Sequence, residues 1–400
     1  MATARRRRVI VIGLLLACLA AGAAALLWAR GSDEAEATNA VDASGEPGRV
    51  RYMKGAMPEF DRFSSDPKWT GWINAHFWRM RTYTPFFDDK TSGYAGGWFY
   101  RNAYGIATES NTARNHPEWI LKDAAGTSLY IPWNCSGGTC PLYAGDVGNP
   151  EFRAFWLDEA RKTLARGYKG IWIDDVNMPL RVANGDGDHV APVDPRAGGE
   201  MTKAAWRRGM ADFMEEIRAE FPDAELAHNA IWYADEDADV TRQLAAADFI
   251  NLERGVNDEG LRNGTGTFGF ESLLEFIDER HDEEQGVVFD AYADAEPERE
   301  YGLASYFLVN DGNDAYSNGT GSSPNDWWAG FDVDLGDARG RRYAWKGLLR
   351  RDFDGGIVLV NQPEAPPVAV ALDETYRRIG GGELRRAELG SAQGLVLRQR

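Results

Sequence analysis

Two adjacent carboxylates end an apolar stretch of the chain, Gly170-Ile171-Trp172-Ile173-Asp174-Asp175. The apolar residues favour a buried β-strand, and a parallel sheet collects its functional side chains where the strands end. Asp174 and Asp175 are therefore predicted to lie where a barrel enzyme holds its acids. The alternative role for either residue is a cap on the following turn or a buried ion pair.

Three other apolar stretches also end in an acid, at Asp146, Glu253 and Asp290. If Asp174 and Glu253 face one cleft, they form the pair that cleavage of a glycosidic bond requires. One carboxylic acid protonates the leaving oxygen, and one carboxylate attacks the sugar or activates water. Asp175 would orient Asp174 and separate the pKa values of the two acids. A simple ion pair with Arg254 is the alternative role for Glu253.

Polar residues near the same strand ends are predicted to bind the substrate. Asn229 suits a sugar hydroxyl, whereas a structural role is the alternative for its neighbour His228. The complete polar set predicted for the substrate site is Asp146, Asn177, His228, Asn229 and Asp290.

The chain contains 14 tryptophans, and sugar rings stack on aromatic planes. Trp156 and Trp206 lie on helix-spaced apolar stripes and are expected in the core. Trp98, Trp133 and Trp232 lie between the expected elements, and we predict that they line the substrate cleft.

No metal or cofactor is predicted. The chain has no His-Glu-x-x-His motif, which disfavours a catalytic zinc. The segments 184–188 and 311–314 are rich in oxygen ligands, but neither completes a calcium-binding loop, so we expect solvated turns there. The absence of a Gly-x-Ser-x-Gly motif disfavours an esterase.

The elements that must position these residues alternate between strands and helices. Apolar patterns predict helices at 67–80, 150–166, 202–220, 239–247 and 271–284. Strands are expected at 50–56, 98–106, 142–147, 170–174, 225–232, 249–254, 286–290 and 303–309. This alternation predicts an α/β fold, a (β/α)8 TIM barrel over residues 49–340. A doubly wound sheet is the alternative, but no Gly-x-Gly-x-x-Gly loop follows an early strand.

Residues 341–400 differ from the barrel region in the sequence pattern of their expected elements. Short strands at 355–361, 368–372 and 394–398 are separated by Pro, Gly and Asp, with no helical pattern between them. They predict a small all-β domain, and a domain of that size needs to pack on the barrel.

The N-terminus predicts export. Four arginines, Arg5 to Arg8, precede an uncharged apolar run from Val9 to Trp28, so residues 1–30 are either a signal peptide or a signal anchor in the membrane. Residues 31–48 are rich in Ala, Glu, Asp, Gly and Ser and are expected to form a flexible linker. In both cases the remainder of the chain lies outside the cell.

Charge and cysteine content agree with an exported protein. The net charge of -18 disfavours a nucleic acid partner and suits a neutral or cationic substrate. Cys135 and Cys140 are close in the chain and are expected to form a local disulfide, since two cysteines do not make a zinc site.

The segment 170–174 resembles the strand-four nucleophile motif of glycoside hydrolase family 31 and its α-galactosidase relatives, whose Asp attacks the anomeric carbon. The wider chain resembles hypothetical glycosyl hydrolase-like family 15. The resemblance assigns a role by position to Asp174 alone, because family 31 continues with Met-Asn-Glu where this chain has Asp-Val-Asn. The acid/base residue of these relatives is an Asp on strand six, where this chain has Glu253. The segments that carry the resemblance are 76–88, 116–123, 148–153, 170–177 and 356–361.

The resemblance implies a TIM barrel with a small β domain and cleavage of a polysaccharide. Together with the residues it predicts an exported glycoside hydrolase that acts on an extracellular or cell-wall polysaccharide. A non-catalytic, membrane-anchored glycan-binding barrel is the alternative.

Overall fold

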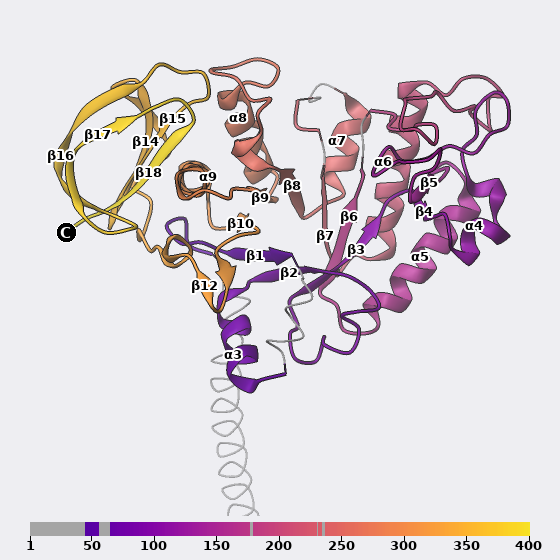
Figure 1. Cartoon of the computed structure of the whole chain (residues 1–400), viewed down its shortest axis with the longest axis horizontal. Coiled ribbons are helices and arrows are strands. Elements are labelled where there is room, and N and C mark those ends of the chain that lie inside the picture. Colours follow the sequence, from indigo (N-terminus) through magenta and orange to yellow (C-terminus); the bar gives the residue numbers. More distant parts are fainter. Residues whose placement is uncertain (1–44, 56–64, 177–178, 230, 234–236) are drawn as a thin grey trace, which may run out of the picture. The chain divides into compact units, whose positions relative to one another are not determined.

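The computed structural model describes residues 45–55, 65–176, 179–229, 231–233 and 237–400 (Figure 1). Its central element is a closed barrel of parallel strands in the order β1-β10-β9-β8-β7-β6-β3-β2, which confirms the predicted TIM barrel. The barrel strands are β1 (Tyr52–Gly55), β2 (Arg79–Thr82), β3 (Gly97–Asn102), β6 (Gly170–Asp174), β7 (Glu225–Asn229), β8 (Phe249–Glu253), β9 (Gly286–Asp290) and β10 (Ala315–Ser317).

Helices follow most of these strands and cover the outside of the barrel. Pro150 in the first turn and the Asn149 side chain, which accepts hydrogen bonds from two backbone amides, start α5 where the sequence predicts it. The principal helices are α3 (Pro67–His76), α5 (Pro150–Leu164), α6 (Lys203–Glu220), α7 (Ala238–Ala245), α8 (Phe270–Asp282) and α9 (Glu296–Val309).

Alternate residues of each barrel strand face inward and outward. On β6, Trp172 belongs to the cluster that fills the barrel, whereas Ile171 and Ile173 pack outward against the helices. The same alternation directs Asp174 inward, because it lies two residues after Trp172. The inner cluster consists of Met53, Trp78, Trp98, Trp172, Ala227, Val288 and Ala315.

Polar contacts close the barrel at the amino-terminal ends of its strands. Arg79 donates from Nε and Nη2 to the two carboxylate oxygens of Glu225, at 2.7 Å each. Trp98 adds a hydrogen bond from Nε1 to Glu225 Oε2, also at 2.7 Å. These three residues, together with the aromatic rings above them, form the floor of the barrel.

Two predicted barrel strands are wrong. The segment 142–147 contains β5 (Leu142–Ala144), which pairs antiparallel with β4 (Gly105–Ala107) outside the barrel. The segment 303–309 is the end of α9, which is buried on all sides and so carries no polar face to mark it as a helix. The two barrel strands missing from the prediction are β2, which was assigned in part to a helix, and the short β10.

The chain between β3 and β6 makes a long excursion that includes a short helix, α4 (Asn111–Asn115), and the β4–β5 pair. Cys135 and Cys140 form a disulfide within this excursion, as the sequence predicts. The bond closes a local loop and leaves the barrel strands unconstrained.

The C-terminal region is a six-stranded antiparallel sheet, drawn in yellow in Figure 1. One of its faces packs on α9, where Gly394 lies so close that an added Cβ would stand 2.7 Å from the Cβ of Ala304. Arg351 donates to the carbonyls of Phe307 and Asn310 at the end of α9. The strands are β13 (Tyr343–Trp345), β14 (Leu348–Phe353), β15 (Gly356–Asn361), β16 (Val368–Arg378), β17 (Glu383–Leu389) and β18 (Gln393–Arg398).

The expected signal segment, residues 1–30, and most of the expected linker lie outside the described residues. Among the helices of the described part, none combines the length and the apolar character needed to cross a membrane.

Candidate active site

Polar side chains from neighbouring strands meet at the carboxyl ends of the barrel strands. Four of these side chains face the interior of the barrel, because each lies an even number of residues from an inward-facing residue of its strand, such as Trp172 on β6. They are Asp174 on β6, Asn229 on β7, Glu253 on β8 and Asp290 on β9. These four residues form the mouth of the barrel. They come from consecutive strands of the sheet. Glu253 is paired with Asp290, whereas Asn229 is paired with Asn251, two residues before Glu253.

Asp174 is held by donors on both of its carboxylate oxygens. The Tyr100 hydroxyl donates to Oδ2 at 2.7 Å, and Asn229 Nδ2 donates to Oδ1 at 2.9 Å. The backbone amide of Asp175 adds a bond to Oδ1 at 2.8 Å. Asn229 is itself fixed, because its Oδ1 accepts the Val176 amide at 3.1 Å. These bonds fix the orientation of the half-buried Asp174 carboxylate.

Asp175 is buried and turns the chain away from the strand. Its φ of 57° lies in the left-handed region, which Asp and Asn adopt more readily than most residues. Asn102 Nδ2 donates to one of its oxygens at 2.6 Å, and Arg181 Nη1 to the other at 2.9 Å. Asp175 thus touches Asp174 through its backbone amide, while its carboxylate anchors the turn.

Glu253 has a different environment. Solvent reaches its side chain, but the surrounding wall of the mouth partly desolvates the carboxyl group and raises its pKa. The negative charges of Asp174 and Asp290 raise this pKa further, and Arg181 and Arg254 oppose the rise without reversing it. Asp174 and Glu253 therefore act on each other electrostatically across the mouth.

Asp290 supports this arrangement from a buried position. It is 4% exposed, and burial raises its pKa. Arg81 Nη1 lies 3.8 Å from Asp290 Oδ2 and, with hydrogen bonds from Ser317 and Tyr292, favours the charged form. The Tyr292 hydroxyl also lies 3.5 Å from Glu253 Oε1 and so links the two acids.

A pocket of about 430 Å³ opens beside Glu253 and Asn229. Three aromatic residues of its wall contact one another edge to face, with ring centroids 5.6 Å apart for Trp232 and Tyr233 and 4.6 Å apart for Tyr233 and Phe268. The volume is that of a small-ligand pocket, and the wall combines apolar rings with a few polar groups. Asp174 is joined to this pocket through its hydrogen bond with Asn229.

The structure does not bring every predicted residue to the mouth. Trp98 is part of the barrel floor. His228 has the opposite strand parity to Asn229, and its fully buried ring bonds the Gln243 carbonyl of α7. Asp146 is buried in the excursion, paired with Arg196. Trp133 is 58% exposed on that excursion, outside the residues that line the pocket.

Asn177, also predicted to bind substrate, lies outside the described residues. Trp232 is the predicted aromatic that lines the pocket. The residues of the mouth that sequence reasoning missed include Tyr100 and Asn102. The sequence pattern could have identified them, because Trp98, Tyr100 and Asn102 are spaced two residues apart and so share one face of a strand that leads to the mouth.

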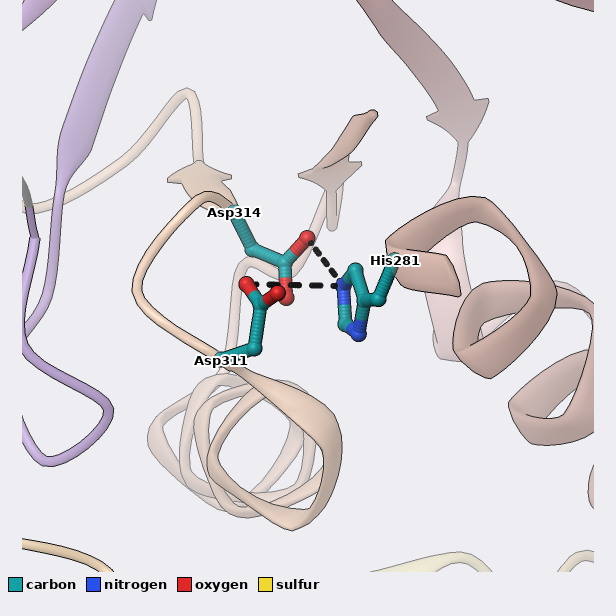
Figure 2. A group of neighbouring side chains, drawn as sticks. All are labelled: His281, Asp311 and Asp314. Atoms are coloured by element: carbon teal, nitrogen blue, oxygen red, sulfur yellow. Dashed lines mark hydrogen bonds and ion pairs between the residues drawn. The ribbon is translucent and has the colours of Figure 1, made fainter. Parts of the chain in front are cut away.

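One group of side chains has the composition of a metal site. His281, Asp311 and Asp314 point toward one another in Figure 2, with their ligand atoms within 4.8 Å. His281 Nε2 lies 2.9 Å from Asp314 Oδ1 and 3.8 Å from Asp311 Oδ1. Burial alone would lower the pKa of His281, but the two carboxylates raise it, which favours a protonated His281 in an ion pair. His281 lies at the end of α8, before β9, and Asp311 and Asp314 lie between α9 and β10, so the group is at the end of the barrel opposite the mouth.

The model of hypothetical glycosyl hydrolase family 15 matches residues 90–357. The chain is similar in structure to the glycoside hydrolase domain of PelA from Pseudomonas aeruginosa, with 14% identity, 67% of this chain and 93% of that chain covered, and a TM-score of 0.39. An alpha-amylase from Lactobacillus plantarum shows 11% identity, 88% and 100% coverage, and a TM-score of 0.46. No curated protein matches the chain.

Proposed function

The chain belongs to hypothetical glycosyl hydrolase family 15, and from this membership we propose an exported enzyme that cleaves an extracellular or cell-wall polysaccharide with Asp174 and Glu253. The observation that carries the proposal is the contrast between the two acids. Asp174 is fixed by three donors on both oxygens, whereas Glu253 has a raised pKa and opens into the pocket. Two carboxyl groups in such different environments are suited to different roles.

Glu253 is the general acid in this proposal. A raised pKa keeps its proton available closer to neutral pH, and its exposed carboxyl can reach a glycosidic oxygen bound in the pocket. Transfer of this proton to the oxygen accompanies cleavage of the bond between that oxygen and the anomeric carbon.

Asp174 is the nucleophile or base. Its carboxylate either attacks the anomeric carbon or takes a proton from the water that does so. Tyr100 and Asn229 prevent rotation of the carboxylate, so that its geometry is set before the substrate arrives. Asp175 acts as a positioning residue through the amide that donates to Asp174.

Two further observations support the substrate class and the location. The aromatic wall of Trp232, Tyr233 and Phe268 suits the apolar faces of sugar rings. The Cys135–Cys140 disulfide is the kind of bond that persists in an oxidising compartment, and the basic and apolar N-terminal residues supply the means of export.

The proposal is tested by incubating the full chain with starch, chitosan, polygalacturonate and cell-wall polysaccharides and measuring new reducing ends. We expect product from at least one polymer with the wild type and none with Glu253→Gln. Glu283→Gln, which changes an exposed glutamate at the end of α8, should retain full activity. Binding of a polymer by the wild type without any product would instead indicate a non-catalytic glycan-binding barrel.

A further inference from the structure

A second pocket, of about 710 Å³, adjoins the pocket beside Glu253. The two pockets share Arg254, Asp258 and Leu261 as wall residues, so they lie side by side. Arg254 has a left-handed φ of 63°, which turns the chain directly after Glu253 and places this arginine on the boundary of both pockets.

Glu253 stands at the junction. It lines the first pocket, and its Oε1 lies 3.5 Å from the hydroxyl of Tyr292, which lines the second. Ala291, the residue after Asp290, also lines the second pocket. A chain-like ligand that extends from one pocket to the other would therefore run beside the proposed general acid.

The C-terminal sheet supplies one wall of the second pocket, through Pro363, Glu364, Ser391 and Ala392. This wall is fastened to the barrel. Gln362 accepts a hydrogen bond from the Gly264 amide at 2.8 Å and donates one to Glu271 Oε1 at 2.7 Å. The wall is thus built on a fixed contact between the sheet and the loop that precedes α8.

Acidic groups predominate in this second pocket. Its lining carries the carboxylates of Asp258, Glu259, Glu298 and Glu364 and the guanidinium groups of Arg254 and Arg262. Arg262 is partly neutralised, because its Nε lies 3.4 Å from Glu364 Oε1. An excess of carboxylates repels uronate chains and favours ligands whose hydroxyl or amino groups donate hydrogen bonds.

We propose that the second pocket continues the substrate cleft beyond Glu253, so that the enzyme holds an uncharged or amine-bearing polysaccharide on both sides of the bond it cleaves. The C-terminal sheet then forms part of the substrate site. This inference rests on the proposed glycosidase function, but it concerns binding and can be measured apart from cleavage.

The experiment uses labelled oligosaccharides of increasing length: malto-oligosaccharides, chito-oligosaccharides, de-N-acetylated chito-oligosaccharides and oligogalacturonates. Binding to the full chain is measured by affinity electrophoresis, and cleavage by chromatography. Ala392→Arg would fill and charge the second pocket from the exposed sheet wall, and Ala392→Glu would fill it with the opposite charge. Ala369→Arg, on an exposed position of β16, is the matched control.

For the wild type we expect binding of an uncharged or amine-bearing series to strengthen about tenfold once the chain is long enough to fill both pockets. Ala392→Arg should abolish this gain and leave the shortest ligand of that series unaffected, whereas Ala369→Arg should retain it. For an amine-bearing ligand Ala392→Glu should preserve the gain, and for an uncharged ligand both substitutions should remove it.

Length-independent binding in the wild type, the same gain in Ala392→Arg, or a preference for oligogalacturonates would overturn the inference. Length-dependent binding that Ala392→Arg abolishes, without cleavage of any series, would support the second pocket and contradict the glycosidase function. Failure of the second-pocket inference can therefore be distinguished from failure of the proposed glycosidase function.

Discussion

Glu253 and Asp290 occupy paired positions at the carboxyl ends of neighbouring strands, β8 and β9. Two like charges in such positions disfavour each other, and the charge of Asp290 helps to raise the pKa of Glu253. Arg81 lies near Asp290 and opposes, without reversing, the rise that burial causes in the pKa of Asp290. Asp290 thus contributes to the raised pKa of Glu253, the proposed general acid.

Asp290→Asn should move the basic limb of the pH profile of kcat/KM to lower pH. That limb follows the pKa of the general acid in the free enzyme, and removal of the Asp290 charge removes one cause of its elevation. The measurement is kcat/KM over the pH range in which the wild type is stable. Asp223→Asn, on an exposed loop, should leave the limb in place. An unchanged or upward-shifted limb in Asp290→Asn would contradict the assignment of Glu253.

Asp174→Asn should lower kcat by roughly a thousandfold or more, because it removes the attacking or proton-accepting oxygen. The amide has the same shape, so the thermal unfolding midpoint should stay close to that of the wild type. Both quantities are measured on the same preparation, with Asp223→Asn as the control. Rates like those of the wild type in Asp174→Asn would rule out its proposed role.

Tyr100→Phe should reduce kcat by roughly 10- to 100-fold, the effect of losing one hydrogen bond to a charged group. KM should change little, because the phenyl ring remains and Tyr100 positions Asp174. Tyr343→Phe is the matched control, since it removes a similar tyrosine-to-aspartate bond, of 2.6 Å to Asp352, on the C-terminal sheet. Equal activities of the two variants would show that the bond to Asp174 does not matter for catalysis.

The ion pair of His281 should make stability depend on pH. Its folded pKa is raised above the ordinary value of 6.5, so its contribution is complete below that value and is lost as pH rises through the folded pKa. The free energy of unfolding in urea should therefore fall over that interval, and His281→Gln should flatten this part of the curve. The prediction would be contradicted if the wild type lost stability as pH fell through the same interval and His281→Gln did not.

Arg351→Met should destabilise the fold by about 2–4 kcal/mol, because two buried carbonyls at the end of α9 lose a charged donor. The quantity is the free energy of unfolding from urea titrations. Arg341→Met, at an exposed position ten residues earlier, should cost less than about 0.5 kcal/mol. A similar small loss in both variants would show that the arginine does not couple the sheet to α9.

The sequence predicts a barrel of eight strands correctly, but two of the strands it assigns are wrong and two real barrel strands, β2 and β10, are missing from it. β2 and β10 are short, and β2 consists of Arg-Met-Arg-Thr, so neither shows the apolar stretch that marks a buried strand. The apolar end of α9 resembled such a strand, because the barrel covers one side of the helix and the C-terminal sheet the other. β6, β7 and β8 nevertheless kept their places as the fourth, fifth and sixth barrel strands.

Strand parity explains which site residues were predictable. The inward positions of Asp174, Asn229 and Glu253 follow from counting in steps of two along an apolar strand. The same count would have placed His228 on the outer face. The Asp146–Arg196 pair could not be predicted, because a loop 50 residues further along the chain supplies the arginine.

Arg79, Trp98 and Glu225 fill the amino-terminal end of the barrel, as expected for a barrel whose interior is packed with side chains. Hydrolysis consumes one water molecule for each bond broken, and in the proposed enzyme that water enters from the mouth, where the substrate also binds. The proposed substrate and the hydrolytic water would therefore reach Asp174 and Glu253 from the same side of the barrel.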